Sequence, residues 1–299
     1  MGRYTAVVVA LVRHVVVALV GSVVAGVALL GHSIKRLPPG SPFHVAQSLL
    51  DGTLPHGDIV ALIGDSHTHG LCGADWVPSI RERYRQRVFV NAGMNCNLAW
   101  NVGQRLSGIL DLDPRAAVVL IGSNDAMATL NDGAAQVYML DQGLPQLPSA
   151  DFFRDNLRRI LGRLREAGVH RRAVVTLPPL GEDPASEYNK LISAFNNDIR
   201  AIGAENGAVI LPLNEKIWKL IHELRLDSPP PRMLEYLPDN RRVLQMVKSL
   251  AQHYAMGKSW DEISAASGLV ALSDNIHLND RGGKLLEDLV SEFLSSEQS

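Results

Sequence analysis

Short apolar segments alternate with longer helical stretches along most of this chain, and this alternation constrains the fold more than any other feature. The apolar segments are rich in valine, isoleucine and alanine and lack a regular polar alternation, which is typical of strands covered on both faces. They occupy residues 58–64, 87–93, 116–125, 171–179 and 207–213. Strand followed by helix, repeated, predicts an α/β fold with a doubly wound central parallel sheet.

Helical stretches are expected between these strands. They lie near residues 74–85, 97–111, 151–167 and 186–206, with a closing amphipathic helix over 280–294. The stretch from about 214 to 268 breaks the alternation and contains the proline-rich run SPPPR at 228–232. We interpret it as a late helical insertion, which either covers the functional site as a lid or packs for stability.

Composition excludes several classes of protein. The 299 residues carry a formal net charge of -2 and no long run of like charges, so a nucleic-acid-binding surface has no support. Only two cysteines are present, which excludes a disulfide-dense scaffold and a four-cysteine zinc site.

Residues 1–36 differ from the rest, because they are almost wholly aliphatic apart from a few basic residues such as Arg13. A membrane-spanning helix from Val15 to about residue 34 would reach about 26–30 Å, close to the hydrocarbon thickness of a bilayer. A cleaved signal peptide is the alternative, but only weak cleavage sites follow the apolar stretch. We therefore predict an N-terminal signal anchor over 1–36, a linker over 37–44, and a domain over 45–299 outside the cytoplasm, in the periplasm or cell envelope.

Three of the predicted strands end in small polar residues. These ends are Gly64-Asp65-Ser66, Asn91-Ala92-Gly93 and Gly122-Ser123-Asn124-Asp125. The carboxyl ends of parallel strands meet at one edge of a sheet, where ligands bind in folds of this kind. We therefore expect a functional site at this edge.

The residue types there and near the carboxyl terminus fit acyl transfer. A serine hydroxyl becomes a nucleophile when a base, usually histidine, takes its proton, and a carboxylate orients that histidine. Asp274 and His277 lie three residues apart in the loop SDNIHLND, a spacing that lets one turn bring the carboxylate to the imidazole. The Ser66 and Gly93 amides and the Asn124 side chain are candidate donors for an oxyanion.

These segments resemble a known family. Gly64-Asp65-Ser66, Gly93 in NAGMN, Asn124 in GSND and the DNIH segment resemble the four ordered blocks of the SGNH, or GDSL, hydrolases. The resemblance covers about residues 58–296, and VVTLPPLGE with YNKLI is similar to the lysophospholipase- or esterase-like branch.

The resemblance implies a flavodoxin-like three-layer α/β/α sandwich and a serine ester hydrolase that uses no cofactor. It implies the roles of nucleophile for Ser66, base for His277 and orienting carboxylate for Asp274, with the Ser66 amide, Gly93 and Asn124 as the oxyanion hole. The expected partner is a small-molecule, lipid or acetylated-glycan ester, together with the membrane. Two alternatives stay open: an O-acyltransferase that uses the same site on a glycan or lipid, and a non-catalytic binding module.

Two pairs of residues near the site have more than one interpretation. Cys72 and Cys96 follow neighbouring turns and form a disulfide if the domain is exported, or else remain as two half-buried thiols. His67 and His69 suggest a metal site, but two histidines without a third ligand are weak support, so we predict no metal.

Overall fold

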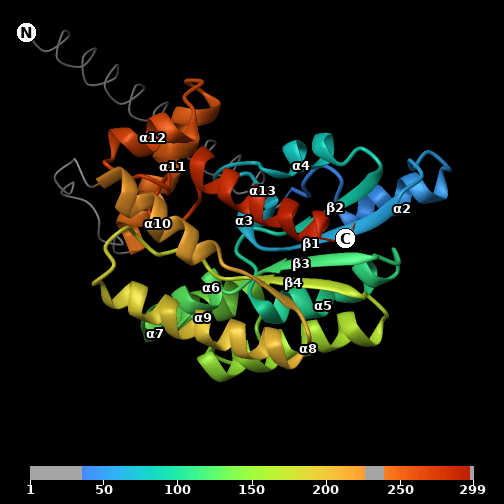
Figure 1. Cartoon of the computed structure of the whole chain (residues 1–299). Helices are drawn as coiled ribbons and strands as arrows, with labels where there is room; N and C mark the ends of the chain where they lie inside the picture. Colours follow the sequence, from blue (N-terminus) through green and yellow to red (C-terminus); the bar gives the residue numbers. More distant parts are fainter. Residues whose placement is uncertain (1–35, 226–238, 297–299) are drawn as a thin grey trace, which may run out of the picture. The chain divides into compact units, whose positions relative to one another are not determined.

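The computed structural model describes residues 36–225 and 239–296, and its compact unit begins at Pro38 (Figure 1). The core of this unit is a parallel sheet in the order β2-β1-β3-β4-β5. The strands are β1 (Asp58–Gly64), β2 (Arg87–Gly93), β3 (Ala116–Leu120), β4 (Arg171–Val175) and β5 (Val209–Leu211). This is the flavodoxin-like strand order, so the predicted parallel α/β sandwich is confirmed.

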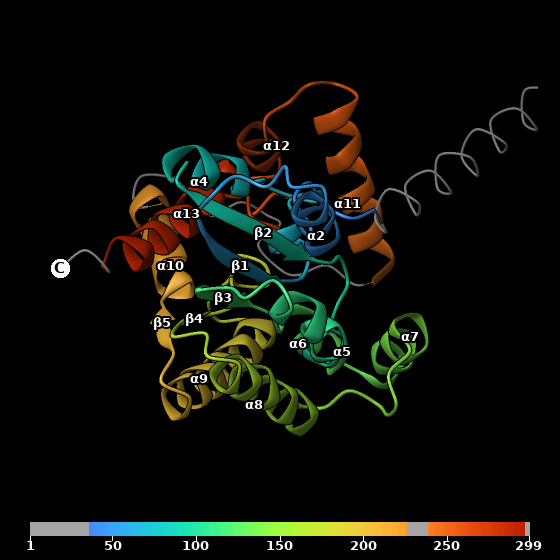
Figure 2. The ribbon, with the colours of Figure 1, turned by 90° about the vertical axis from the view of Figure 1, so that its right-hand side faces the viewer.

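Helices cover both faces of the sheet (Figure 2). One face carries α4 (Val77–Arg83) and α13 (Asp280–Ser295), and the other carries α5 (Ala99–Leu110), α8 (Ala150–Glu166) and α9 (Glu187–Glu205). Strands β1, β2 and β3 are buried along nearly their whole length, which explains why their sequences are continuously apolar.

Helix α8 illustrates how the local sequence sets these elements. Ser149 caps its first turn by accepting the backbone N–H of Phe152, and arginines lie in its last turn, where they oppose the helix dipole. Its apolar residues recur at helical spacing and are buried against the sheet and α9. Phe153 contacts Phe195 of α9 with ring centroids 4.9 Å apart.

The pairing register brings the ends of the central strands level. Gly64, the last residue of β1, pairs with Gly93 at the end of β2 and with Leu120 at the end of β3. Strands β3, β4 and β5 are shorter than predicted, because the predicted ranges included the polar turn after β3, residues 176–179 after β4 and residues on both sides of β5. The turns that follow β1, β2 and β3 therefore lie together at the carboxyl edge of the sheet, as expected.

The remaining helices surround this core. They are α2 (Pro42–Leu50), α3 (Ser66–His69), α6 (Ser123–Ala128), α7 (Asp132–Gln142), α10 (Leu213–Arg225), α11 (Asp239–Tyr254) and α12 (Trp260–Ala266). Ile217 and Ile221 of α10 are buried in the main core, so α10 belongs to the sandwich and the departure from it begins later than the predicted residue 214. Helix α2 starts inside the predicted linker, because Ser41 caps it and Pro42 takes its first position.

The predicted fold class needs one correction, which concerns the membrane-spanning helix. That prediction falls on residues 1–35, which lie outside the described residues. Within 36–225 and 239–296, no helix combines the length and the apolar character needed to cross a bilayer. Aliphatic composition and the length of the apolar stretch suggested the span, and the described residues support the α/β sandwich but not a membrane-spanning helix.

Candidate active site

Ser66 lies in a short helix that begins directly after strand β1. Asp65 caps this helix, because its side-chain carboxylate accepts the backbone N–H of His67 at 3.0 Å. The helix ends at Gly70, whose φ of 85° is in the left-handed region that favours glycine. A strand, a capping aspartate and a closing glycine thus place Ser66 at the carboxyl edge of the sheet.

Gly64 and Gly93 let this turn lie close to the neighbouring strands. A Cβ atom on Gly64 would lie 2.4 Å from the carbonyl oxygen of Leu120, and one on Gly93 would lie 2.3 Å from the backbone nitrogen of His69. Both distances are shorter than real contacts allow. A side chain at either position would therefore force the Ser66 turn away from the sheet.

His277 and Asp274 lie in a loop whose base is closed by an antiparallel bridge between Leu272 and Leu278. Within the loop, Oδ1 of Asp274 accepts the backbone N–H groups of Ile276 at 3.1 Å and of His277 at 2.8 Å. These bonds fix the carboxylate relative to the loop backbone, so the loop presents the imidazole in one orientation.

Three side chains from opposite ends of the sequence meet at this edge. Oδ2 of Asp274 lies 2.8 Å from Nδ1 of His277, and Nε2 of His277 lies 2.9 Å from Oγ of Ser66. All three residues are buried, with exposed fractions of 1% for Asp274, 5% for His277 and 8% for Ser66. Because Nδ1 faces a carboxylate, it carries the proton, and Nε2 is left to accept one from the serine.

Electrostatics favour charge separation between the imidazole and the carboxylate. Burial alone disfavours the imidazolium, but the charge and hydrogen bond of Asp274 outweigh burial and raise the pKa of His277 above its ordinary value. Burial likewise penalises the Asp274 carboxylate, yet His277 and two backbone amides outweigh it and lower the pKa of Asp274. The pair can therefore hold a proton taken from Ser66.

Asn124 lies beside the nucleophile turn. Its Nδ2 atom donates to the carbonyl oxygen of Asn97 at 3.0 Å and lies 3.5 Å from Oδ2 of Asp65. The Tyr138 hydroxyl donates to Oδ1 of Asn124 at 3.0 Å, which orients the amide so that its NH₂ group faces the turn that carries Ser66.

Gly93 has a different environment from the predicted one. Its N–H donates to Oδ1 of Asn91 at 3.0 Å, so this amide already has a partner inside the strand end. The glycine is needed there for the close approach of the Ser66 turn. The sequence pattern predicted an oxyanion donor at Gly93, whereas the structure explains the glycine by its close packing against the Ser66 turn.

The structure has thiols at Cys72 and Cys96 and no disulfide between them, which is the second of the two interpretations left open by the sequence. Cys72 is buried, and burial is the main cause that raises the pKa of its thiol, followed by the negative charges of Asp274 and Cys96. The turns that carry the two cysteines are close enough to interact, as expected. Proximity of two turns does not supply the Cβ geometry that a disulfide requires.

His67 is buried directly against the catalytic candidate His277, with ring centroids 5.6 Å apart. Burial, assisted by the charge of His277, lowers the pKa of His67 to about 3, so its ring stays neutral at physiological pH. His69 is also buried. In the part of the chain that the structure describes, no group of three or more His, Cys, Asp or Glu side chains could hold a metal ion.

Sequence reasoning missed Arg105, a partly buried side chain that joins the strand ends around the site. It donates to the carbonyl oxygens of Ala92 at 2.7 Å and Gly64 at 2.9 Å, and to Oδ1 of Asn97 at 3.0 Å. Burial lowers the pKa of Arg105 to about 10. The only signal in the sequence was a single arginine within an otherwise uncharged amphipathic helix.

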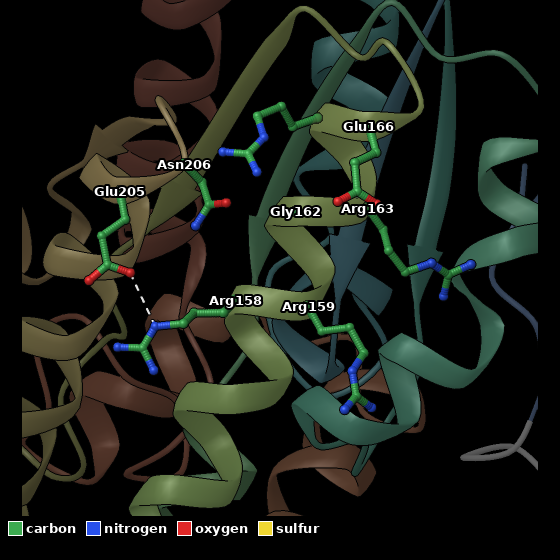
Figure 3. Close-up of a pocket in the computed structure, with 8 residues that line it drawn as sticks. Arg158, Arg159, Gly162, Arg163, Glu166, Glu205 and Asn206 are labelled. Carbon is green, nitrogen blue, oxygen red and sulfur yellow. Dashed lines mark hydrogen bonds and ion pairs between the residues drawn. The ribbon is translucent and has the colours of Figure 1, made fainter.

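A depression of about 500 Å³ is lined mainly by charged side chains of α8 and the end of α9. Figure 3 shows these side chains. Arg158 and Glu205 form an ion pair across the depression at 3.1 Å. Helix α8 ends just before β4 begins, so this depression lies at the amino ends of the strands. It is therefore at the opposite edge of the sheet from Ser66.

A family model described as the GDSL-like lipase/acylhydrolase family matches residues 62–285, a range that includes the nucleophile turn and the histidine loop. The chain belongs to this family. The recognition made from the sequence is thus confirmed, and so is the predicted class of activity, because this acylhydrolase is a carboxylic ester hydrolase. A search of curated proteins found no match.

Solved structures share the fold of this GDSL-like acylhydrolase. The acetyl xylan esterase AlAXEase is 17% identical with a TM-score of 0.56, over 78% of this chain and 98% of that one. A catalytic mutant of Axe2, an acetylxylan esterase from Geobacillus stearothermophilus, is 12% identical with a TM-score of 0.55, over 80% and 95%. A lipase/acylhydrolase from Enterococcus faecalis is 16% identical with a TM-score of 0.51, over 80% and 96%.

Proposed function

We propose that this acylhydrolase cleaves esters of small acyl groups, acetyl above all, through a covalent acyl-enzyme on Ser66. The observation that carries the proposal is the unbroken series of contacts from Asp274 through His277 to the Ser66 hydroxyl, at 2.8 Å and 2.9 Å. A serine in this arrangement has a base within hydrogen-bond reach, and the base is itself oriented by a carboxylate.

In the first half of the reaction, Nε2 of His277 takes the proton of the Ser66 hydroxyl while Oγ attacks the ester carbonyl carbon. The carbonyl π electrons move to the oxygen, which becomes an oxyanion. The imidazolium then gives its proton to the leaving alcohol as the ester C–O bond breaks, and the acyl group stays on Ser66.

In the second half, His277 takes a proton from water, and the resulting hydroxide attacks the acyl carbon. Collapse of this second tetrahedral species breaks the bond to Oγ, which regains a proton from His277. The products are a carboxylic acid and the free enzyme, so no cofactor enters the balance.

Two donors are proposed for the oxyanion. The Ser66 amide lies in the first turn of a helix, where N–H groups lack intrahelical acceptors. The Asn124 amide is held next to that turn by Tyr138. We leave Gly93 out of this role, because its single N–H is bonded to Asn91. The Asn124 NH₂ group has two hydrogens, of which one is bonded to Asn97 and the other makes, among the described residues, only the long 3.5 Å contact with Asp65.

A small acyl group is favoured by the burial of the reacting atoms. Ser66 exposes 8% of its surface and His277 5%, so little of either side chain is open to a bulky acyl group. The acetylxylan esterases with the same fold add support for an acetylated carbohydrate as the substrate class.

A series of p-nitrophenyl esters from acetyl to palmitoyl tests both parts of this proposal. We expect kcat/KM to be highest for acetyl and to fall as the chain lengthens. A fluorophosphonate probe should label the wild-type protein and should not label the Ser66→Ala variant. Full esterase activity in purified Ser66→Ala would overturn the mechanism, whereas a preference for palmitoyl would overturn only the substrate class. Acetyl transfer to an added sugar, in preference to water, would identify an acyltransferase instead.

A further inference from the structure

The loop that carries Asp274 and His277 is attached to the sheet by a carboxylate outside the catalytic triad. Glu182 follows strand β4 and is fully buried. Its Oε1 atom accepts the backbone N–H groups of Val270, Ala271 and Leu272 at 2.9, 2.8 and 3.0 Å. Three consecutive amides thus converge on one carboxylate at the entrance to the loop.

A cation, the guanidinium of Arg225, completes the environment of Glu182. Arg225, at the end of α10, forms an ion pair with Oε2 of Glu182, and its other terminal nitrogen donates to the Glu182 carbonyl oxygen at 2.9 Å. Both side chains are largely shielded from water, with exposed fractions of 15% for Arg225 and 0% for Glu182. Charge-assisted hydrogen bonds in such surroundings are about twice as strong as neutral ones.

The residues held by Glu182 form the base of the histidine loop. Leu272 pairs with Leu278 in the antiparallel bridge, and the backbone N–H of Asn279 donates to the carbonyl oxygen of Ala271 at 2.9 Å. The segment next to Glu182 also reaches the tip of the loop, because the N–H of Gly181 donates to the carbonyl oxygen of Asn275 at 2.8 Å. The segment that follows β4 therefore contacts the loop at both its base and its tip.

These contacts bear on one distance in particular, the distance from Nε2 of His277 to Oγ of Ser66. The bonds between Asp274 and the loop backbone lie inside the loop, so they move with it. The distance from Nε2 of His277 to Oγ of Ser66 joins the loop to a different element, and only the placement of the whole loop sets it. A misplacement of about 1 Å between reacting groups can cost about 10²-fold in rate.

We propose that Glu182 is a positioning residue, which holds the Asp274–His277 loop at the distance from Ser66 that proton transfer requires. The proposal rests on the serine esterase function proposed above. Glu182 touches neither the substrate nor the reacting atoms, and it acts through the backbone of residues 270–272. Its effect should therefore appear in kcat per active site, with substrate binding and the internal Asp274–His277 contact preserved.

The test compares Glu182→Gln with a matched control, Glu215→Gln. Glu215 is also paired with an arginine, Arg200, and accepts the Thr176 hydroxyl at 3.2 Å. It is half exposed, and within the described part of the chain it forms no hydrogen bond or ion pair with residues 270–279. Active sites are counted by stoichiometric fluorophosphonate labelling of Ser66, and kcat and KM are measured with p-nitrophenyl acetate.

We expect Glu182→Gln to lower kcat per labelled site by about 10-fold to 10²-fold, with KM changed less than about twofold. The acid limb of its pH profile should stay where it is in the wild type, because His277 keeps Asp274. Glu215→Gln should keep kcat within about twofold of the wild type. A purely structural role for Glu182 would reduce the number of labelled sites and the melting temperature but leave kcat per site unchanged, and that result would overturn the inference.

Two further outcomes are separable. If the wild type and Glu215→Gln show neither turnover nor labelling of Ser66, the proposed function fails, and the inference that rests on it fails for that reason. If Glu182→Gln yields no folded protein, Arg225→Gln is tested in its place, because this variant keeps the Glu182 carboxylate and removes its ion pair with Arg225. A fall of about threefold or more in its kcat per site supports the inference, and an unchanged value overturns it.

Discussion

Nε2 of His277 lies 2.9 Å from Oγ of Ser66, although the two residues are 211 positions apart in the sequence. Each partner is fixed by its own local bonds: Asp65 caps the Ser66 turn, and Asp274 accepts two backbone amides of the histidine loop. The contact therefore exists before any substrate arrives. Substitutions that change the charge or the hydrogen-bond donors of the site, but leave its backbone in place, should therefore alter kcat more than substrate binding.

The first prediction concerns pH. In the proposed mechanism His277 is the general base and must be neutral, so activity should be lost as the pH falls and His277 takes up a proton. Asp274 raises the pKa of His277 above its ordinary value of about 6.5, and Asp65, whose own pKa burial raises to about 7, adds negative charge nearby when it ionises. The acid limb of kcat/KM for p-nitrophenyl acetate should therefore have its midpoint above about 6.5.

Asp274→Asn is the matched variant for this prediction. It removes the charge that opposes burial, so the midpoint should move to lower pH, and kcat should fall by about 10⁴-fold because the amide no longer selects the correct tautomer. An acid limb that stays in place in this variant would show that another group titrates.

The second prediction concerns Asn124. If its Nδ2 atom donates to the oxyanion, Asn124→Ala should lower kcat by about 10²-fold to 10³-fold, with a smaller effect on KM. Tyr138→Phe removes only the hydroxyl that orients the amide, at 3.0 Å, and should cost about 2-fold to 10-fold. Steady-state kinetics of both variants check this order, and a larger loss in Tyr138→Phe than in Asn124→Ala would contradict it.

The sequence predicted the elements, and which three side chains meet at the carboxyl edge of the sheet, better than it predicted the contacts that support them. Strands β1 and β2 have the predicted bounds, because a buried parallel strand leaves a continuous apolar run that ends at a turn. Helix α7 was not expected, since its apolar residues form only a weak stripe and two of them, Val137 and Leu140, are exposed.

The sequence indicated Asp274 as the partner of His277, but it did not indicate the partners of the supporting polar groups. Glu182 contacts residues about 90 positions away, and nothing local distinguishes it from a surface glutamate. The bond from the Gly93 amide to Asn91 is local, but it depends on a rotamer that a pattern of residue types does not specify. Long-range pairing and side-chain orientation are set by the assembled fold, and a motif records only the residue types.

The third prediction concerns the cysteines. Under non-reducing conditions, the denatured protein should give two reactive thiols per chain with a thiol reagent such as DTNB. In the native protein Cys72 should react much more slowly than Cys96, because Cys72 is buried and the pKa of its thiol is raised. Cys96→Ser should leave only the slow phase. Fewer than two thiols in the denatured, non-reduced protein would contradict the structure.

The last prediction concerns the stability contributed by Arg105. Arg105→Met removes one donor from each of three acceptors, namely the carbonyl oxygens of Gly64 and Ala92 and Oδ1 of Asn97, although Gly64 keeps the N–H of Met94 at 3.1 Å. We expect the free energy of unfolding, measured by urea denaturation, to fall by about 2–5 kcal/mol. Removal of the cation next to Asp65 should also raise the pKa of Asp65 further, since Arg105 is one of the groups that lower it.

Two further variants serve as comparisons for Arg105→Met: one keeps the charge of Arg105 without its geometry, and the other is a surface control. Arg105→Lys keeps the charge but cannot reach three acceptors at once, so its loss of stability should lie between those of the wild type and Arg105→Met. Arg159→Met, on the exposed side of α8, should change the unfolding free energy by less than about 0.5 kcal/mol. Equal losses in Arg105→Met and Arg159→Met would show that the three bonds contribute nothing. A loss in Arg105→Lys as large as that in Arg105→Met would show that the stabilisation depends on the geometry of the guanidinium, because the charge alone would then contribute nothing.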